Sequence, residues 1–239
     1  MDTQYNQHPH QQLNDKDYEN QAKSDINEAL RLGFIRKVFG ILSFQLLLTV
    51  LMCSLTFIDS FRTFFTENLA IFWVCLGLSI MVIIPLICCK SVARKIPINY
   101  ILLTVWTLCE AYMVATCCSK YEPKVVIAAA SMTCAVTLAL TVYSFTTKTD
   151  FTFLGGMLFV SVVALIMFGI FAFIVPALHA LYCILGVFVY SIYLIYDIQL
   201  VMGKFGIEYN IEDYILAALM IYIDIIQIFL YLLQLFGKK

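Results

Sequence analysis

The sequence predicts an all-α membrane protein that crosses the bilayer seven times. Three observations carry this prediction: 62% of the 239 residues are hydrophobic, only 13% are charged, and the charged residues gather in an N-terminal tail and in short segments between long apolar stretches. Each apolar stretch has the roughly 20 residues that a helix needs to cross about 30 Å of hydrocarbon. This composition excludes a soluble domain with a polar surface, and it leaves no basic surface of the kind that binds nucleic acid.

The first 33 residues are predicted to form a separate polar cytoplasmic unit. Residues 1–24 are rich in Gln, Asn, Asp and Lys, so they lack the apolar content to fold, and we expect a disordered tail without a cleavable signal peptide. Asp25 and Glu28 have the spacing of a capping box, which predicts an amphipathic helix at the membrane surface leading into the first span. The membrane domain follows over residues 34–239.

The membrane domain divides into seven apolar stretches separated by short polar or proline-containing segments. Pro85 is expected to bend the second stretch, and Pro123 is well placed for the first turn of the fourth. With alternating spans, ten of the 15 Lys and Arg residues fall on the side of the N-terminus, so the positive-inside rule predicts a cytoplasmic N-terminus. The predicted spans are residues 38–58, 69–89, 99–119, 125–145, 151–175, 178–202 and 213–236.

Two acids lie deep inside the last two stretches, Asp197 in the sixth and Asp224 in the seventh. An ionisable group inside a span costs about 3 to 10 kcal/mol or more unless it is paired or faces water. In an antiparallel helix pair the two acids lie within about one helical turn of the same level, so we expect them to form a shared site. In the alternative, each acid bonds a neighbouring Tyr or Gln and only fixes helix packing.

A pair of carboxyl groups would act both as a proton sensor and as a weak calcium site. Two acids a few Å apart cannot both ionise cheaply, so they would share a proton and titrate as a coupled pair. Ionised carboxylates are also hard oxygen ligands that suit Ca²⁺, and weak binding suits conduction. Tyr193 and Gln227 stand one helical turn from Asp197 and Asp224, respectively, and are expected to bond them.

Further charged residues are expected to support a cation pathway. Glu110 is the one other acid inside an apolar stretch; it is either a second cation station or an acid hydrogen-bonded between helices. Three acids between the last two spans would make the cytosolic mouth acidic and concentrate cations there. These acids are Glu208, Glu212 and Asp213.

Five segments with a motif-like character extend across the membrane domain. They read FIRKVFGILSFQL (34–46), RKIPINY (94–100), TTKTDFT (146–152), YLIYDIQL (193–200) and AALMIYIDIIQIF (217–229). In these segments the chain resembles the transmembrane Bax inhibitor-1 motif family, and within it the Lifeguard branch. The resemblance covers residues 30–237.

The resemblance implies a seven-helix fold in which the last helix is central and surrounded by the other six. It also implies a pH-sensitive calcium leak across the endoplasmic reticulum, the Golgi or a related membrane, with the plasma membrane as a further location, and suppression of cell death. The family's paired aspartates correspond to Asp197 and Asp224. In some members an arginine near the cytosolic end of the second helix joins the pair, and here Lys90 and Arg94 flank that place.

Two other functions stay open on the sequence. A non-conducting anti-apoptotic protein would bind death receptors or Bcl-2 relatives through its tail or loops, with the aspartates only structural. An intramembrane aspartyl protease also takes one Asp from each of two helices, but bulky residues, not glycines, precede Asp224. The chain has no Ser/His or Cys/His pair in a motif context, and its nine cysteines lack metal spacing. We therefore expect no enzyme and no resident cofactor, with lipid and transported calcium as the contacts.

Overall fold

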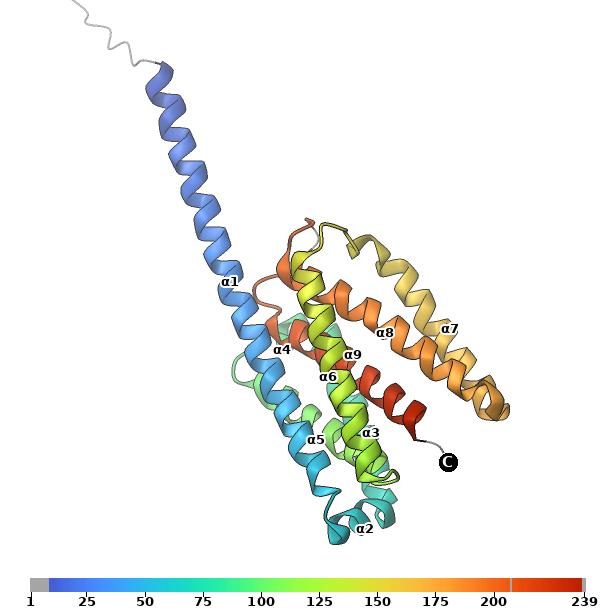
Figure 1. Ribbon diagram of the computed structural model, residues 1–239. Coiled ribbons are helices and arrows are strands. Elements are labelled where there is room, and N and C mark those ends of the chain that lie inside the picture. Colours follow the sequence, from blue (N-terminus) through green and yellow to red (C-terminus); the bar gives the residue numbers. More distant parts are fainter. Residues whose placement is uncertain (1–8, 207, 238–239) are drawn as a thin grey trace, which may run out of the picture.

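The computed structural model describes residues 9–206 and 208–237, and within these residues the chain forms helices joined by short connections (Figure 1). The predicted all-α class is confirmed. Two short 3-10 turns, Thr152–Leu154 and Pro176–Leu178, precede α7 and α8. The helices are α1 (Pro9–Leu55), α2 (Asp59–Glu67), α3 (Leu69–Cys88), α4 (Lys90–Ala93), α5 (Ile98–Cys118), α6 (Pro123–Thr146), α7 (Gly155–Ile174), α8 (His179–Met202) and α9 (Tyr214–Phe236).

Seven helices in the described part of the chain are long and apolar enough to cross a membrane, which confirms the predicted number of spans. They are α1, α3 and α5 to α9. Two shorter helices lie in segments that were expected to be loops, α2 in the first return loop and α4 after the second span. Pro123 begins α6 as predicted, and Pro85 lies inside α3, one turn before its end.

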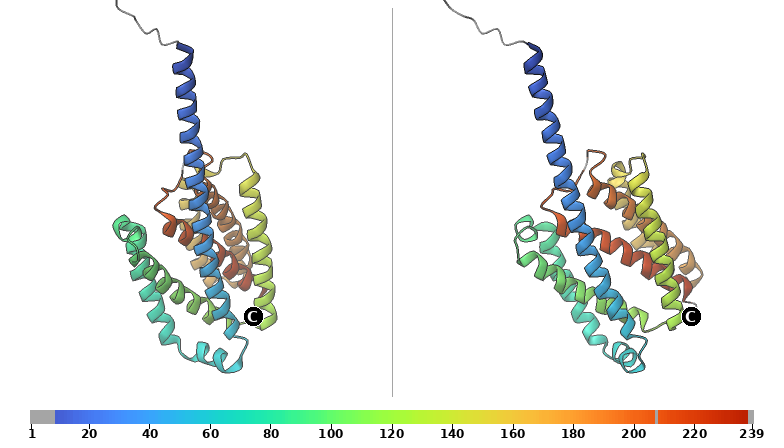
Figure 2. Two further views of the ribbon diagram at one scale, coloured as in Figure 1. Left: turned by 90° about the vertical axis from the view of Figure 1, so that its left-hand side faces the viewer. Right: turned by 60° about the vertical axis from the view of Figure 1, so that its left-hand side comes forward.

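Helix α9 is the most buried span, as predicted for a central last helix. In its membrane-spanning window 67% of the residues are buried and in α5 61%, against 17–22% in the other five spans. The extensive contacts of α9 are with α1, α5, α6 and α8, whereas α3 packs on α5 and α7 packs on α8. The bundle therefore differs from the implied ring of six helices around one, because α3 and α7 form an outer layer (Figures 1 and 2).

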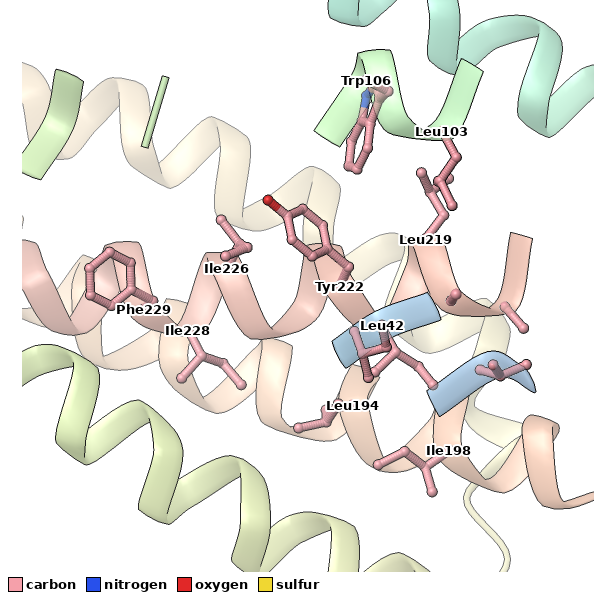
Figure 3. Packing of buried hydrophobic residues seen from close by; sticks show 14 of the residues in the cluster. Leu42, Leu103, Trp106, Leu194, Ile198, Leu219, Tyr222, Ile226, Ile228 and Phe229 are labelled. Carbon is pink, nitrogen blue, oxygen red and sulfur yellow. The ribbon is translucent and has the colours of Figure 1, made fainter. Parts of the chain in front are cut away.

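The core lies where α9 meets α1, α5 and α8. Figure 3 shows Leu219 and Tyr222 of α9 beside Leu103 and Trp106 of α5. The rings of Trp106 and Tyr222 meet edge to face with their centroids 5.5 Å apart, and the Tyr222 hydroxyl is hydrogen-bonded to that of Thr49 in α1 at 2.8 Å. Because lipid is as apolar as this core, close packing and a few polar contacts decide which helix faces point inward.

Helix α1 differs from the predicted N-terminal unit. The sequence predicts disorder up to residue 24 and a helix start at Asp25, whereas one uninterrupted helix runs from Pro9 to Leu55 and extends beyond the rest of the bundle (Figure 2). The polar segment continues a helix that the first span already nucleates, so it needs no capping box of its own. Residues 1–8 lie outside the described residues, where the disordered tail stays a prediction.

The end of the bundle opposite the α8–α9 connection is tied together by an arginine. Arg62 of α2 donates hydrogen bonds from Nε to the carbonyl oxygen of Ser119 and from Nη2 to that of Tyr121, each at 2.9 Å. These two carbonyls belong to the turn between α5 and α6. The predicted return loop is therefore a short helix fastened to the next turn at this end of the bundle.

Candidate functional site

Asp197 and Asp224 face one cavity between α8 and α9. Both side chains are buried, with 5% and 4% of their surface exposed, and the cavity has a volume of about 470 Å³. Helices α8 and α9 run antiparallel and supply eight of its ten lining residues, with one more from α7 and one from the α8–α9 connection. The lining residues are Val162, Tyr190, Tyr193, Tyr196, Asp197, Leu200, Tyr209, Met220, Ile223 and Asp224.

Close packing and a buried amide fix the position of α8. Gly186 lies against the ring of Tyr231 in α9, where a Cβ atom would come within 2.6 Å of the ring carbons, so glycine permits the approach of the two helices. Gln199, two residues after Asp197, is fully buried. Its Nε2 donates to the Thr149 carbonyl at 2.9 Å and its Oε1 accepts the Phe151 N–H at 2.8 Å. These contacts hold the acid-bearing turn of α8 against the connector before α7.

The acid pair has few polar neighbours. The Tyr209 hydroxyl donates a hydrogen bond to Asp197 Oδ1 at 3.2 Å. The carboxyl group of Asp224 faces that of Asp197, and its Oδ2 atom is buried with no hydrogen-bond donor in the described part of the chain. Among the described residues, none that lines the cavity is basic. The charge of the pair is therefore not balanced by an ion pair within the cavity.

This arrangement can hold a proton or a cation. Two facing carboxyl groups interact favourably when one proton lies between them, or when a cation lies between two ionised groups. The described residues contain no group of three or more His, Cys, Asp or Glu side chains that could hold a metal. A Ca²⁺ ion, which takes six to eight oxygen ligands, would need water beside the carboxylates, and such a donor set is suited to weak binding.

The structure separates the other residues that the sequence places near the pair. Tyr193 lines the cavity, whereas Gln227 does not. Glu110 also lies outside the cavity, on the α5 face that meets α3, where its Oε1 accepts a hydrogen bond from the Ser79 hydroxyl at 2.6 Å. Of the two readings of Glu110, the structure favours the acid that is hydrogen-bonded between helices.

Two arginines pair with the three acids of the predicted mouth and offset two of their three negative charges, so the mouth is less acidic than the sequence suggests. Arg31 of α1 lies 3.4 Å from Glu208. Arg94 lies 2.9 Å from Glu212 and donates to both carboxylate oxygens of Asp213, at 2.8 and 3.0 Å. The acids are therefore part of ion pairs that join the α8–α9 connection to α1 and to the segment before α5.

Lys90 and Arg94, the two basic residues expected near the aspartate pair, do not reach it. The hydrogen bond to Asp213 raises the pKa of Arg94, which is thus engaged at the start of α9 and does not line the cavity. Lys90 is exposed at the start of α4. Neither residue therefore takes the place of the arginine that the family resemblance implies beside the pair.

Sequence reasoning missed three residues that shape this site: Tyr209, Arg31 and Gln199. Tyr209 is an aromatic residue among polar neighbours, which is a usable signal. Arg31 carries no such signal, because its contacts lie 169 and 178 residues away. Gln199 is an amide inside an apolar stretch, and such an amide needs a partner.

Comparisons with known proteins agree with this architecture. Residues 31–239 match the family described as inhibitor of apoptosis-promoting Bax1. Over 217 residues the chain is 39% identical to protein lifeguard 3 of Homo sapiens and 37% to that of Mus musculus, covering 88% of this chain and 70% of each relative. It is 35% identical to protein LIFEGUARD 4 of Arabidopsis thaliana, covering 87% of this chain and 85% of that relative. This multi-pass membrane protein therefore belongs to the Bax inhibitor-1 family, and its predicted resemblance to Lifeguard proteins is confirmed.

Proposed function

We propose that this protein is a pH-sensitive calcium leak of an intracellular membrane, the endoplasmic reticulum or the Golgi, with its N-terminus in the cytosol. Asp197 and Asp224 form the gate: they take up either protons or calcium, so the ion passes only in certain protonation states. By lowering store calcium the leak suppresses cell death. The family description and the names of the relatives support the anti-apoptotic part of this proposal.

One observation carries the calcium part. Two buried acids from adjacent helices face the same cavity of about 470 Å³, and Asp224 Oδ2 has no donor within the described residues. A membrane protein retains such a pair at an appreciable energetic cost unless protons or cations compensate it. Glu110, the other acid inside an apolar stretch, is half-buried and has its own hydrogen-bond donor, so it needs no ion.

A non-enzymatic role fits the surroundings of Asp224 better than proteolysis. Ile221 and Tyr222, just before it, are each only 1% exposed, and Tyr222 is packed on Trp106 and bonded to Thr49. A substrate strand would have to displace this part of the core to reach the acid. We therefore propose transport of calcium, with no reaction and no resident cofactor.

The decisive experiment is calcium flux into proteoliposomes that contain the purified protein, measured from pH 6 to 8. We expect a protein-dependent flux that varies with pH, and we expect Asp197→Asn or Asp224→Asn to remove that variation. Glu110→Gln is the matched control, because it neutralises an intramembrane acid outside the cavity. If folded wild-type protein gives no flux at any pH, the leak proposal fails.

The same variants separate the leak from a non-conducting role in cell death. In cells, we expect Asp197→Asn and Asp224→Asn to lose both the lowering of store calcium and the protection from apoptosis stimuli. A protein that acts only by binding death receptors or Bcl-2 relatives through its tail or loops would keep its protective effect in both variants.

A further inference from the structure

The segment that leads into α9, residues 208–213, is held from two sides and contributes Tyr209 to the cavity of the acid pair. We call it the cap segment. Arg31 binds it at Glu208 and Tyr209, and Arg94 binds it at Glu212 and Asp213. Its only residue that lines the cavity is Tyr209.

Among the described residues that line the cavity, Tyr209 alone does not come from a helix. Its hydroxyl reaches Asp197 Oδ1 at 3.2 Å. Burial raises the pKa of Tyr209, and the nearby Asp197 raises it further, so the phenol keeps its proton and acts as the donor in this hydrogen bond. Tyr209 thus lines the cavity from the loop side, and its hydroxyl bonds one oxygen of Asp197.

Arg31 holds the backbone of Tyr209 in this position. Its Nη1 donates to the Tyr209 carbonyl at 2.7 Å and its Nη2 to the Leu200 carbonyl at 2.5 Å. The Leu200 carbonyl also accepts the Tyr209 N–H at 3.3 Å. The Arg31 side chain is only 13% exposed. The guanidinium therefore fastens the cap segment to the last turn of α8, three residues beyond Asp197.

Gly203 leaves the space for this clamp. It ends α8 with a φ of +68°, a backbone conformation that favours glycine. A Cβ atom there would overlap the Glu208 carboxylate and lie 2.9 Å from Arg31 Nη2. Glycine at this position therefore leaves room for the Arg31 side chain, which crosses the turn at the end of α8.

We propose that Tyr209 is the third partner of the acid pair, closing the cavity toward the loop side, and that Arg31 is the positioning residue that keeps it closed. This inference rests on the proposed leak function, because it names how the same site is covered. A cation that approaches Asp197 from the loop side meets the Tyr209 side chain first. Opening the cavity on this side breaks one hydrogen bond, from the neutral Tyr209 hydroxyl to Asp197. Arg31 and Arg94 meanwhile hold the cap segment, which carries Tyr209.

The first test measures access to the acids without any ion flux. A water-soluble carbodiimide modifies carboxyl groups, and its extent of reaction at Asp197 and Asp224 is read from peptides by mass spectrometry. We expect labelling to rise several-fold in Tyr209→Ala and in Arg31→Gln, and less in Tyr209→Phe, which keeps the ring. Arg31→Lys keeps the charge beside Glu208 but cannot donate to both carbonyls in the same fork, so it should resemble Arg31→Gln.

Matched controls lie at the other end of the bundle. Arg62→Gln removes an arginine that also clamps two backbone carbonyls of a turn, and Tyr121→Phe removes a phenolic hydroxyl from that turn. We expect neither to change the labelling of Asp197 and Asp224. Circular dichroism and gel filtration confirm that each variant is folded, and Tyr209→Phe supplies a mild substitution if Tyr209→Ala does not fold.

Calcium flux in proteoliposomes then separates the inference from the function on which it rests. We expect Tyr209→Ala and Arg31→Gln to conduct several-fold faster than wild type at neutral pH. If wild type conducts but labelling and flux are unchanged in the folded Tyr209 and Arg31 variants, Tyr209 is no cover and the inference is overturned while the leak stands. If labelling rises but neither wild type nor any variant conducts, the leak is overturned and Tyr209 still covers the acid pair.

Discussion

The two most buried spans each carry an intramembrane acid, and the two acids are treated differently. In α5, Glu110 meets the Ser79 hydroxyl of α3 at 2.6 Å. In α9, Asp224 meets another acid, Asp197, and has an oxygen without a donor in the described part of the chain. Glu110 therefore has a hydrogen-bond donor on a neighbouring helix, whereas one oxygen of Asp224 has none among the described residues. An acid in a span therefore indicates a functional site only when its neighbours leave it unsatisfied.

The largest expected effect separates the two acids by ion binding. Replacing both cavity acids, Asp197→Asn with Asp224→Asn, should abolish calcium binding, because it removes both ligand charges, whereas Glu110→Gln should leave binding unchanged. Terbium luminescence or calorimetry on purified protein measures this. Wild-type binding should also weaken as the pH falls, since protons compete for the same oxygens. Loss of binding in Glu110→Gln would erase the distinction between the two acids.

The next effect concerns stability on the α5 side. Ser79→Ala removes the donor that Glu110 uses, and a half-buried acceptor left without its partner costs about 1–3 kcal/mol. We expect a lower melting temperature for this variant in detergent, followed by circular dichroism, with calcium binding retained. Ser161→Ala is a matched control, because that hydroxyl bonds only the carbonyl of Met157 in its own helix. An unchanged melting temperature would show that Glu110 is satisfied without Ser79.

A smaller effect of opposite sign is expected on the α9 side. In Asp224→Asn the new amide can donate to Asp197, so two facing acceptors become a hydrogen-bonded pair. We expect the variant to be more stable than wild type by about 1 kcal/mol at alkaline pH, where the acid pair holds no proton, because a donor then replaces an unsatisfied buried acceptor. Thermal unfolding without calcium measures the change. A fall in stability would mean that the acid pair already stabilises the fold.

The smallest effect is expected at Gln227, which the sequence places beside Asp224. It is partly buried but does not line the cavity. Gln227→Leu should leave calcium binding and its pH dependence as in wild type, as measured by the same titration. A tenfold or larger loss of affinity, about 1.4 kcal/mol, would show that Gln227 is a ligand. The cation would then bind closer to the C-terminal end of α9 than the cavity indicates.

The number of spans, the class of fold and the presence of two acids inside apolar stretches can be derived from the sequence alone. Length and apolarity suffice for the spans because the bilayer sets one required length, and Asp197 and Asp224 are conspicuous because acids are rare in apolar stretches. The family was also accessible, since its motifs are local strings of residues. Each of these signals can be detected within about 25 consecutive residues.

Which polar groups meet depends on how the helices pack. Arg31 and Tyr209 are 178 residues apart and Ser79 and Glu110 are 31 apart, so no periodicity in the chain connects them. Apolarity does not separate inner from outer faces, because lipid and core are equally apolar. From the sequence, the acids of the α8–α9 connection are expected to form an exposed, negatively charged surface. Packing of α1 and of the segment before α5 against that connection brings Arg31 and Arg94 to these acids, and the resulting ion pairs hold the connection in place.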